Sequence, residues 1–300
     1  MSAQKMHEGQ IDIDADLVRR LLEGQFPQWA GLPLARYSST GTVNAIYRLG
    51  DEMYVRLPLV KEWAWHIKAE GTWLPRMRPH MPVEIPEVLG NGEPTDAYPL
   101  QWSIQRWIEG GTWGAHGVSD DREGALDLAS FLKALWSVDT TGEEPLDPQF
   151  DVPLLAAHDE WIRESIELSK EWIDADALTA AWDAALELPP FGGPYVWVHS
   201  DLGPDNLLVR DGRFAAVIDW GSLHVGDAAR DLCVWPMFSR DARAIFRDTL
   251  EVDDATWARA RAWVIRAVGG IHFYVDSNPS HMRMCIEAIE VLLEEVETDG

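Results

Sequence analysis

One short part of the chain combines the residue types that phosphoryl transfer requires. Residues 199–206 read HSDLGPDN, which fits the pattern H-x-D-x-x-x-x-N, and residues 219–221 read DWG thirteen positions after the Asn. In phosphoryl transfer one carboxylate accepts the proton of the attacking hydroxyl, while a second carboxylate and a carboxamide hold Mg²⁺ against the phosphates. We therefore expect Asp201 to act as the base and Asn206 and Asp219 to bind Mg²⁺.

An alternative interpretation treats these residues as ordinary loop and turn residues, because Asp, Asn and Gly are common there. His, Asp and Asn at these offsets arise by chance in roughly a few per cent of chains this long, and the second motif lowers that by about another order of magnitude. The expected context also fits, since a strand over 195–198 leads into the loop and a hairpin over 207–218 leads to Asp219. His199 is expected to pack against the loop and hydrogen-bond it, although it belongs to the catalytic set.

Residues 198–232 resemble the catalytic and metal-binding core of the aminoglycoside phosphotransferase family of small-molecule kinases. That family shows an HGDxxxxN loop, a D-[FW]-G motif and a G-D-x-x-x-D-L run, and Ser200 stands here where Gly is usual. The resemblance implies that Asp231 braces the loop through backbone hydrogen bonds, and that Asp227 does the same or faces the acceptor. Trp220 is a further candidate on the acceptor side or as a brace.

The N-terminal third extends the resemblance, so that it covers roughly residues 30–275. Residues 54–58 (YVRLP) and the helix that carries Glu70 are similar to a strand and helix C of the family, and residues 104–110 (IQRWIEG) resemble its hinge strand. The implied nucleotide-binding residues are Arg56, Glu70, Ser39, Thr40, Gly41, Arg106 and Ile108.

Arg56 stands where kinases usually have a Lys that touches the phosphates and pairs with the helix-C Glu. Arg can neutralise phosphate and pair with Glu70, but its planar fork differs from an ammonium. Lys61 or Lys68 could take the phosphate role instead, and Arg56 could be a solvated charge on an edge strand. The loop that would cover the phosphates has one Gly, so by itself it resembles an ordinary turn.

Hydropathy patterns and turn residues predict the elements that position these groups. Strands are expected at 34–38, 43–49, 53–57, 85–88, 102–107, 195–198, 207–209 and 214–218. Helices are expected at about 14–23, 61–77, 120–136, 158–172, 176–188, 240–250, 254–275 and 281–296. A β-rich N-terminal third therefore precedes a helical remainder. This agrees with the α+β, bilobal, protein-kinase-like fold that the resemblance implies, with a nucleotide-binding lobe at 1–105 and a catalytic and acceptor-binding lobe at 106–300.

Composition excludes several other classes of protein. The 300 residues carry 50 Asp and Glu against 25 Lys and Arg, a net charge of −25, which disfavours nucleic acid and anionic membranes as partners. Two Cys support neither a disulfide framework nor a Cys-type zinc site. Residues 1–10 lack the apolar core of a secretory signal and no apolar run of 18 residues occurs, so a cytoplasmic location is expected.

The charge is unevenly distributed along the chain. Residues 1–105 hold 13 acidic against 10 basic residues, and residues 106–300 hold 37 against 15, which favours a cationic acceptor, although acidic helix faces that confer solubility would give the same count. We therefore expect a Mg²⁺-dependent O-phosphotransferase (kinase) that moves the γ-phosphate of ATP or GTP to a hydroxyl of a small molecule. An aminoglycoside-type antibiotic is the favoured acceptor, and such an activity would confer antibiotic resistance. The alternatives are a metabolic kinase for choline, fructosamine, a hydroxyl amino acid or a macrolide, and a nucleotide-binding pseudokinase.

Overall fold

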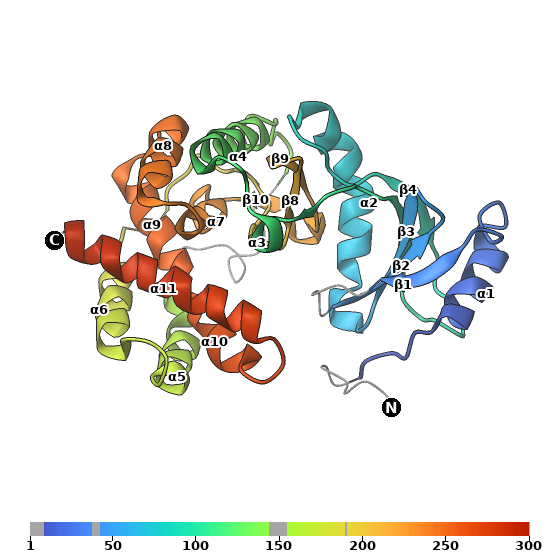
Figure 1. Cartoon of the computed structure of the whole chain (residues 1–300), viewed down its shortest axis with the longest axis horizontal. Coiled ribbons are helices and arrows are strands. Elements are labelled where there is room, and N and C mark those ends of the chain that lie inside the picture. Colours follow the sequence, from blue (N-terminus) through green and yellow to red (C-terminus); the bar gives the residue numbers. More distant parts are fainter. Residues whose placement is uncertain (1–8, 38–42, 144–154, 190, 300) are drawn as a thin grey trace. The chain divides into compact units, whose positions relative to one another are not determined.

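The computed structural model describes residues 9–37, 43–143, 155–189 and 191–299. The chain, coloured in Figure 1 from blue at the N-terminus to red at the C-terminus, forms two compact units. Unit 1 comprises residues 1–117 and 205–223, and unit 2 comprises residues 118–204 and 224–300. The segment 205–223 thus packs with the N-terminal part of the chain. The sequence predicts a nucleotide-binding lobe that ends at residue 105 and an acceptor-binding lobe that follows it; this functional division stays a prediction.

Unit 1 is built on a five-stranded antiparallel sheet in the order β1-β2-β3-β5-β4. Its strands are β1 (Leu34–Tyr37), β2 (Asn44–Leu49), β3 (Met53–Pro58), β4 (Val88–Gly92) and β5 (Trp102–Arg106). Strand β2 buries every second residue, as expected for a sheet with one face on the core. Helix α1 (Ala15–Gln25) begins where the Asp14 carboxylate accepts a hydrogen bond from the Leu17 amide at 2.7 Å, and its apolar residues join the core of this sheet.

The rest of unit 1 connects this sheet to the segment that carries Asp219. Its elements are η1 (Lys61–Trp63), α2 (Trp65–Met77), η2 (Arg78–His80), β6 (Gly111–Thr112), α3 (Trp113–His116), β8 (Leu207–Arg210), β9 (Arg213–Val217) and η4 (Trp220–Ser222). Strands β6, β8 and β9 form a three-stranded antiparallel sheet, and a parallel bridge joins Glu84 to Ala216 of β9. Helix α2 packs against η4, so the DWG motif rests on the helix that carries Glu70.

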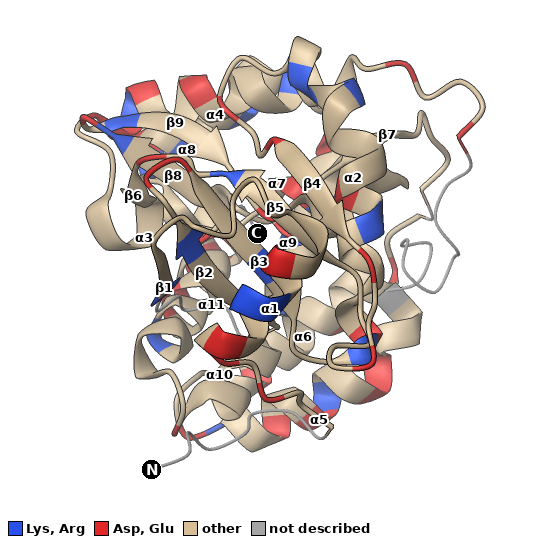
Figure 2. Cartoon of the chain, turned by 90° about the vertical axis from the view of Figure 1, so that its right-hand side faces the viewer, with Lys and Arg blue, Asp and Glu red and all other residues tan. Residues whose placement is uncertain are grey.

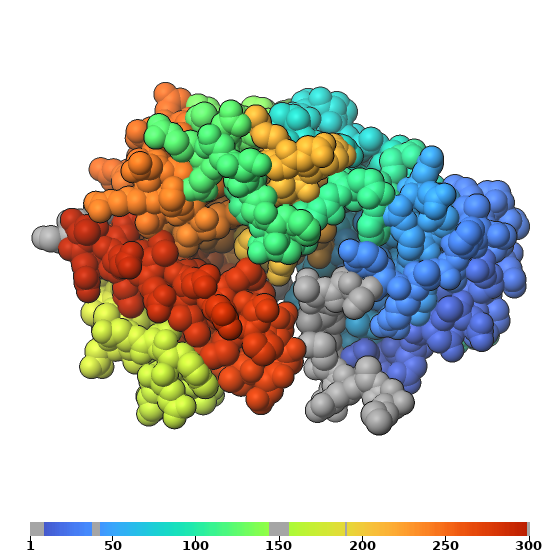
Figure 3. All heavy atoms as spheres, in the orientation of Figure 1, coloured from blue at the N-terminus to red at the C-terminus, as the bar shows by residue number. Residues whose placement is uncertain are grey.

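Unit 2 is mainly helical. Its helices are α4 (Asp121–Trp136), η3 (Leu155–His158), α5 (Asp159–Ser169), α6 (Ala175–Leu186), α7 (Ala229–Leu232), η5 (Trp235–Met237), α8 (Arg240–Leu250), α9 (Asp254–Ile265), α10 (Val268–Tyr274) and α11 (Pro279–Asp299). Strands β7 (Val196–Val198) and β10 (His224–Gly226) pair antiparallel and lead into and out of the two motif segments. Helix α11 packs along α10; in Figure 3 the atoms of this C-terminal part of the chain are coloured red to orange.

The structure confirms most of the expected elements and corrects two. Helix α8 has the predicted bounds, and the expected hairpin between β2 and β3 forms. The strand predicted at 85–88 lies instead at Val88–Gly92, because a glycine at position 92 lets the Trp102 ring approach to within 1.9 Å of where a Cβ would stand. The helix predicted at 254–275 is two helices, and Gly269, after the break, packs closely against Trp161 of α5.

The two units differ strongly in charge. Unit 1 holds 17 acidic and 13 basic residues, and the signs alternate along α1 in Figure 2. Unit 2 holds 33 acidic and 12 basic residues, a net of −21. Across the described ranges, no helix has both the length and the apolar character that crossing a bilayer demands.

Candidate active site

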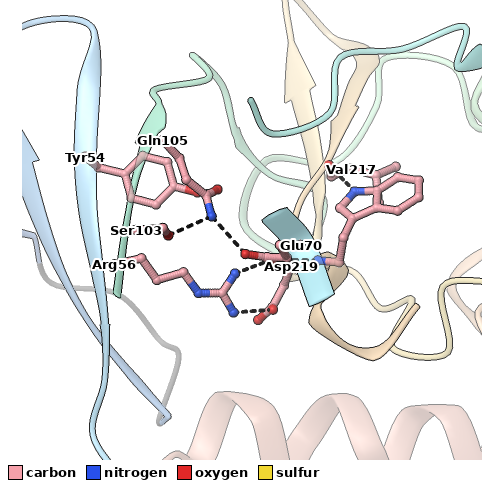
Figure 4. Close-up of polar contacts among 8 residues, drawn as sticks. Tyr54, Arg56, Glu70, Ser103, Gln105, Val217 and Asp219 are labelled. Carbon is pink, nitrogen blue, oxygen red and sulfur yellow. Dashed lines mark hydrogen bonds and ion pairs between the residues drawn. The ribbon is translucent and has the colours of Figure 1, made fainter. Parts of the chain in front are cut away.

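Arg56 joins two of the predicted site carboxylates in unit 1 (Figure 4). Its side chain leaves β3 and is buried; Nη1 donates to Oε1 of Glu70 at 2.5 Å and Nη2 to Oδ1 of Asp219 at 2.6 Å. Lys61 and Lys68, the alternative phosphate ligands, are both exposed. Arg56 is therefore the cation that pairs with the helix-α2 glutamate, and it is not a solvated edge charge.

Glu70 holds three elements together. Besides Arg56, its carboxylate accepts hydrogen bonds from Nε2 of Gln105 at 2.8 Å and from the backbone N–H of Trp220 at 3.1 Å (Figure 4). Gln105 also donates to the Ser103 hydroxyl at 3.1 Å, and its Oε1 accepts from the Tyr54 hydroxyl at 2.6 Å. Gln105, Ser103 and Tyr54 were not among the predicted site residues, although polar residues in an otherwise apolar, buried strand were a usable signal.

The charges in this network stabilise one another. Burial alone would lower the pKa of Arg56, but the Asp219 and Glu70 carboxylates outweigh it and raise that pKa, so the guanidinium stays protonated. Burial raises the pKa of Tyr54, so its hydroxyl stays neutral and can donate. The two carboxylates hold the Arg56 guanidinium in one orientation.

Asp219 and Asn206 offer the oxygen ligands that Mg²⁺ prefers. Asp219 has a left-handed backbone (φ 63°), and about a third of its side chain, 32%, remains exposed beside the Arg56 pair. Asn206 is half-buried at the start of β8, where its backbone carbonyl accepts from the Ile218 amide at 2.9 Å and closes the hairpin that ends at Asp219. Within the described residues no three His, Cys, Asp or Glu side chains cluster as a metal site. These two residues would supply oxygen ligands to a Mg²⁺ ion.

The other half of the motif lies in unit 2, where Asp231 braces the loop. Its buried carboxylate accepts from the backbone N–H of His199 at 2.8 Å and of Ser200 at 2.7 Å, and burial raises its pKa to about 7. Ser200 has φ 70°, the left-handed region that favours glycine, so these bonds hold a serine in a backbone conformation that usually takes Gly. His199 is buried, with its Nδ1 3.4 Å from the Asp201 amide, and Asp201 itself is exposed.

Asp227 and Trp220 occupy structural positions. Asp227 is buried and forms a double hydrogen bond with Arg259, at 2.5 and 3.2 Å, while it also accepts from the Ala229 amide at 3.0 Å. Trp220 is 1% exposed and donates its indole N–H to the Val217 carbonyl at 2.9 Å. Both contacts favour a bracing role over a face open to an acceptor.

The expected hinge residues lie at the end of β5 and just after it. Arg106 ends β5, is exposed, and pairs with Glu87, with Nε 2.7 Å from the Glu87 carboxylate. Ile108 lies half-buried just after this strand. Ser39, Thr40 and Gly41 lie outside the described residues.

Comparisons with known proteins place this site in a family. A family model described as the phosphotransferase enzyme family matches residues 36–263. Wild-type aminoglycoside 2'-phosphotransferase-IIIa, solved as its GDP complex, superposes with a TM-score of 0.71 at 18% identity, covering 96% of this chain and 100% of that one. The streptomycin–ATP ternary complex of APH(2")-IIa gives 0.61 at 19% identity, covering 95% and 97%. The macrolide 2'-phosphotransferase MphH from Brachybacterium faecium, an apoenzyme, gives 0.59 at 21% identity, covering 91% and 97%. No curated protein matches the chain in a sequence comparison.

The fold is therefore the protein-kinase-like fold of these antibiotic kinases, as the sequence predicted. Because the family model spans most of the chain, the protein belongs to the phosphotransferase enzyme family. It is a phosphotransferase.

Proposed function

We propose that the chain transfers the γ-phosphate of ATP or GTP to a hydroxyl group of a small molecule. The observation that carries this proposal is the buried ion pair of Arg56 with Glu70 and Asp219, which prepares a cation and a metal ligand for a polyphosphate. The nucleotide complexes among the similar structures, with GDP, ADP and ATP, support the same co-substrate. The complete set of Asp201, Asn206 and Asp219 argues against a pseudokinase.

Each proposed role follows from a side chain's position. Arg56 offsets negative charge on the phosphates, and Glu70 fixes its guanidinium in place. Asp219 and Asn206 would hold Mg²⁺, which neutralises charge on the phosphate oxygens when bound. Asp201, exposed on a loop that Asp231 braces, orients the acceptor hydroxyl and accepts its proton.

The similar structures constrain the class of acceptor less than they constrain the nucleotide co-substrate. Kanamycin and gentamicin are bound in two of the similar aminoglycoside kinase structures, which supports the aminoglycoside acceptor expected from the sequence. Macrolide phosphotransferases match almost as well, with TM-scores of 0.60 and 0.59. Likeness at about this level of identity shows the fold alone, and the side chains around Asp201 decide which acceptor can bind.

Replacing Asp201 tests the proposed reaction. Asp201→Asn removes the proton acceptor and keeps the shape, so we expect turnover to fall by about 10²- to 10⁴-fold while nucleotide affinity changes less than twofold. Turnover is measured as acceptor-dependent ADP release, and affinity by calorimetry with ADP and Mg²⁺. Asp211→Asn, an exposed substitution at the tip of the β8–β9 hairpin, is the matched control. Equal turnover in the two variants would remove Asp201 from the mechanism.

A further inference from the structure

Arg266 is a charged side chain to which the described part of the fold gives no hydrogen-bond acceptor and no ion-pair partner. It is the half-buried residue directly after helix α9. Among the described residues its side chain makes neither a hydrogen bond nor an ion pair, and its Nε is buried without an acceptor. Buried guanidinium groups are otherwise almost always paired, because each unsatisfied N–H costs free energy.

Arg259 lies seven residues earlier in the chain, on helix α9, and is an arginine with a structural role. Its guanidinium is held by both oxygens of Asp227 and by a bond to the Thr256 hydroxyl at 3.1 Å. The difference between Arg259 and Arg266 is thus one of counter-charge and not of burial alone. Among the described residues, no carboxylate forms an ion pair with Arg266 as Asp227 does with Arg259.

A second arginine lies on the same aromatic ring. The guanidinium carbon of Arg266 is 5.0 Å from the centre of the Trp263 ring, and that of Arg230 is 4.0 Å from it. The Nε of Arg230 lies 3.4 Å from the backbone carbonyl of Ser200, the residue before the proposed base Asp201. Two cations and one indole therefore gather at the loop on which the acceptor hydroxyl would react.

The electrostatics agree with this geometry. Burial, and then the neighbouring Arg230, lower the pKa of Arg266 to about 10, whereas Cys233 and Asp201 oppose the shift. The guanidinium still carries its charge at neutral pH. Burial raises the pKa of the Cys233 thiol to about 12, so this neighbour stays protonated and neutral.

Two structural reasons for a cation here fall short of explaining it. The carboxyl end of helix α9 favours positive charge, and Arg266 stands at its C-cap. Asp201 also attracts it. Neither gives the buried Nε a hydrogen-bond acceptor, and a polycationic acceptor at Asp201 would meet two like charges.

We propose that Arg266, together with Arg230, binds an anionic group of the acceptor, a carboxylate or a phosphate, so that the true acceptor is a hydroxylated anion and not a polyamine. The inference rests on the proposed function, because it takes Asp201 as the place where the acceptor hydroxyl reacts. A planar guanidinium matches the two oxygens of either anion. The Trp263 face beside it suits the apolar surface of a sugar or chain.

The first arm of the test measures anion binding without turnover. Inorganic phosphate is titrated calorimetrically into the full-length wild type, into Arg266→Gln and into Arg247→Gln. Arg247 is the matched control, since it also lies over a tryptophan, 5.2 Å from the Trp257 ring centre, but pairs with Asp254. We expect Arg266→Gln to weaken phosphate binding at least about tenfold and Arg247→Gln to leave it unchanged. Denaturation midpoints of both variants confirm folding, and Arg266→Lys should restore part of the binding.

The second arm identifies the acceptor by charge. Glycerate, gluconate, glycerol 3-phosphate and glucose 6-phosphate are compared with their neutral parents and with kanamycin in an ADP-release assay. We expect turnover to favour the anions, with KM for the preferred anion raised about 10- to 100-fold in Arg266→Gln and KM for ATP unchanged. Preference for the carboxylates or for the phosphates decides between the two anions.

The outcomes separate this inference from the proposed function. Three results would overturn the anion site and leave the phosphotransfer in place. The first is turnover of kanamycin that does not change in Arg266→Gln. The others are phosphate binding that is absent in the wild type, or that is equal in Arg266→Gln and Arg247→Gln. Arg266-dependent phosphate binding without turnover of any acceptor keeps the anion site and counts against the phosphotransfer.

Discussion

Arg56 pairs through a planar guanidinium with the glutamate of helix α2, a pairing that most kinases make with a lysine ammonium. The fork lets two nitrogens bind Glu70 and Asp219 separately, so the helix-α2 carboxylate and the predicted metal ligand are fixed by one side chain. Since Arg56 and Glu70 are both buried, with side chains 5% and 0% exposed, removing either partner strands a charge in the interior. The pair should therefore matter for folding as well as for nucleotide binding.

A double-mutant cycle on this pair gives the first prediction at the residue scale. Arg56→Met should lower the free energy of unfolding by about 3–5 kcal/mol, because it leaves buried Glu70 without its cation. Arg56→Met with Glu70→Gln should cost at least about 1 kcal/mol less than the two single changes added together. Urea denaturation measures all four proteins. The exposed pair of Arg106 and Glu87 is the control and should couple by less than about 1 kcal/mol; additive costs at Arg56 and Glu70 would contradict the buried-pair account.

His66 gives the pH dependence at this scale. Its ring is buried on α2, both ring nitrogens lack a partner among the described residues, and burial lowers its pKa to about 4, against the attraction of Asp219. The unfolded chain therefore binds a proton that the folded chain excludes between the ordinary pKa of about 6.5 and about 4. The free energy of unfolding therefore falls as the pH drops through this window, and His66 accounts for on the order of 1–2 kcal/mol of that loss.

The matching measurement compares the wild type with His66→Leu at pH 7.5 and pH 5 by urea denaturation. The leucine cannot titrate and strands no polar atom, so the loss of stability between these two pH values should be smaller in the variant than in the wild type. An equal loss in both proteins would assign the acid sensitivity to other groups.

At the scale of elements, the contact between α2 and η4 brings the DWG motif to Glu70. Gly221 follows the motif's tryptophan, and a Cβ at this position would stand 2.5 Å from Cβ and Cγ of His66. Only glycine allows this approach, which in turn lets the Trp220 amide reach Glu70. The last residue of the motif is therefore required by packing between two elements as much as by loop conformation.

Gly221→Ala should separate these elements. We expect a loss of about 1–3 kcal/mol in the free energy of unfolding from overpacking, together with weaker binding of ADP and Mg²⁺, since Asp219 lies two residues away. His66→Gly removes both contacted carbons, so Gly221→Ala should cost clearly less stability in a His66→Gly chain than in the wild type. Gly24→Ala in α1, where nothing lies within 4 Å, is the control and should stabilise slightly. A harmless Gly221→Ala would show that α2 and η4 are not tightly packed in solution.

Sequence patterns predicted these elements well where the hydrophobic period is regular and poorly where glycines serve packing. The periodic helix at 240–250 is found with its predicted bounds, whereas β4 begins three residues later than predicted. It includes Gly90 and Gly92, which leave room for the rings of Phe26 and Trp102. In the site, the spacing of Asp201, Asn206 and Asp219 was readable because the residue types themselves specify the chemistry. Arg266 was not, because the lack of an ion-pair partner among the described residues is a property of the fold and has no sequence motif.

At the scale of the whole molecule, the net charge of −25 and the charges next to Asp201 point to different acceptors. The net charge attracts cations over distances of about a Debye length, but it says nothing about the few side chains that touch a ligand. Most of the excess lies in unit 2, and part of it lies on α11, where Glu287, Glu290, Glu294 and Glu297 are exposed at spacings of three and four residues. We infer that this charge confers solubility at the expense of self-repulsion, which makes it weak evidence for a polyamine acceptor.

Self-repulsion has a measurable consequence for stability. Like charges three or four residues apart on a helix destabilise it by about 0.2–0.5 kcal/mol per pair, and salt screens them. The urea midpoint should therefore rise with NaCl. Combining Glu290→Gln, Glu294→Gln and Glu297→Gln should raise the free energy of unfolding at low salt by about 1 kcal/mol and flatten the salt response. Glu295→Gln is the contrasting change, because Glu295 lies within ion-pair distance of Arg243 and Arg261 and accepts from the Trp257 indole at 3.0 Å, so its loss should destabilise. A midpoint that falls with salt would mean that attractive ion pairs outweigh the excess of acid, and the net charge would then again support a cationic ligand.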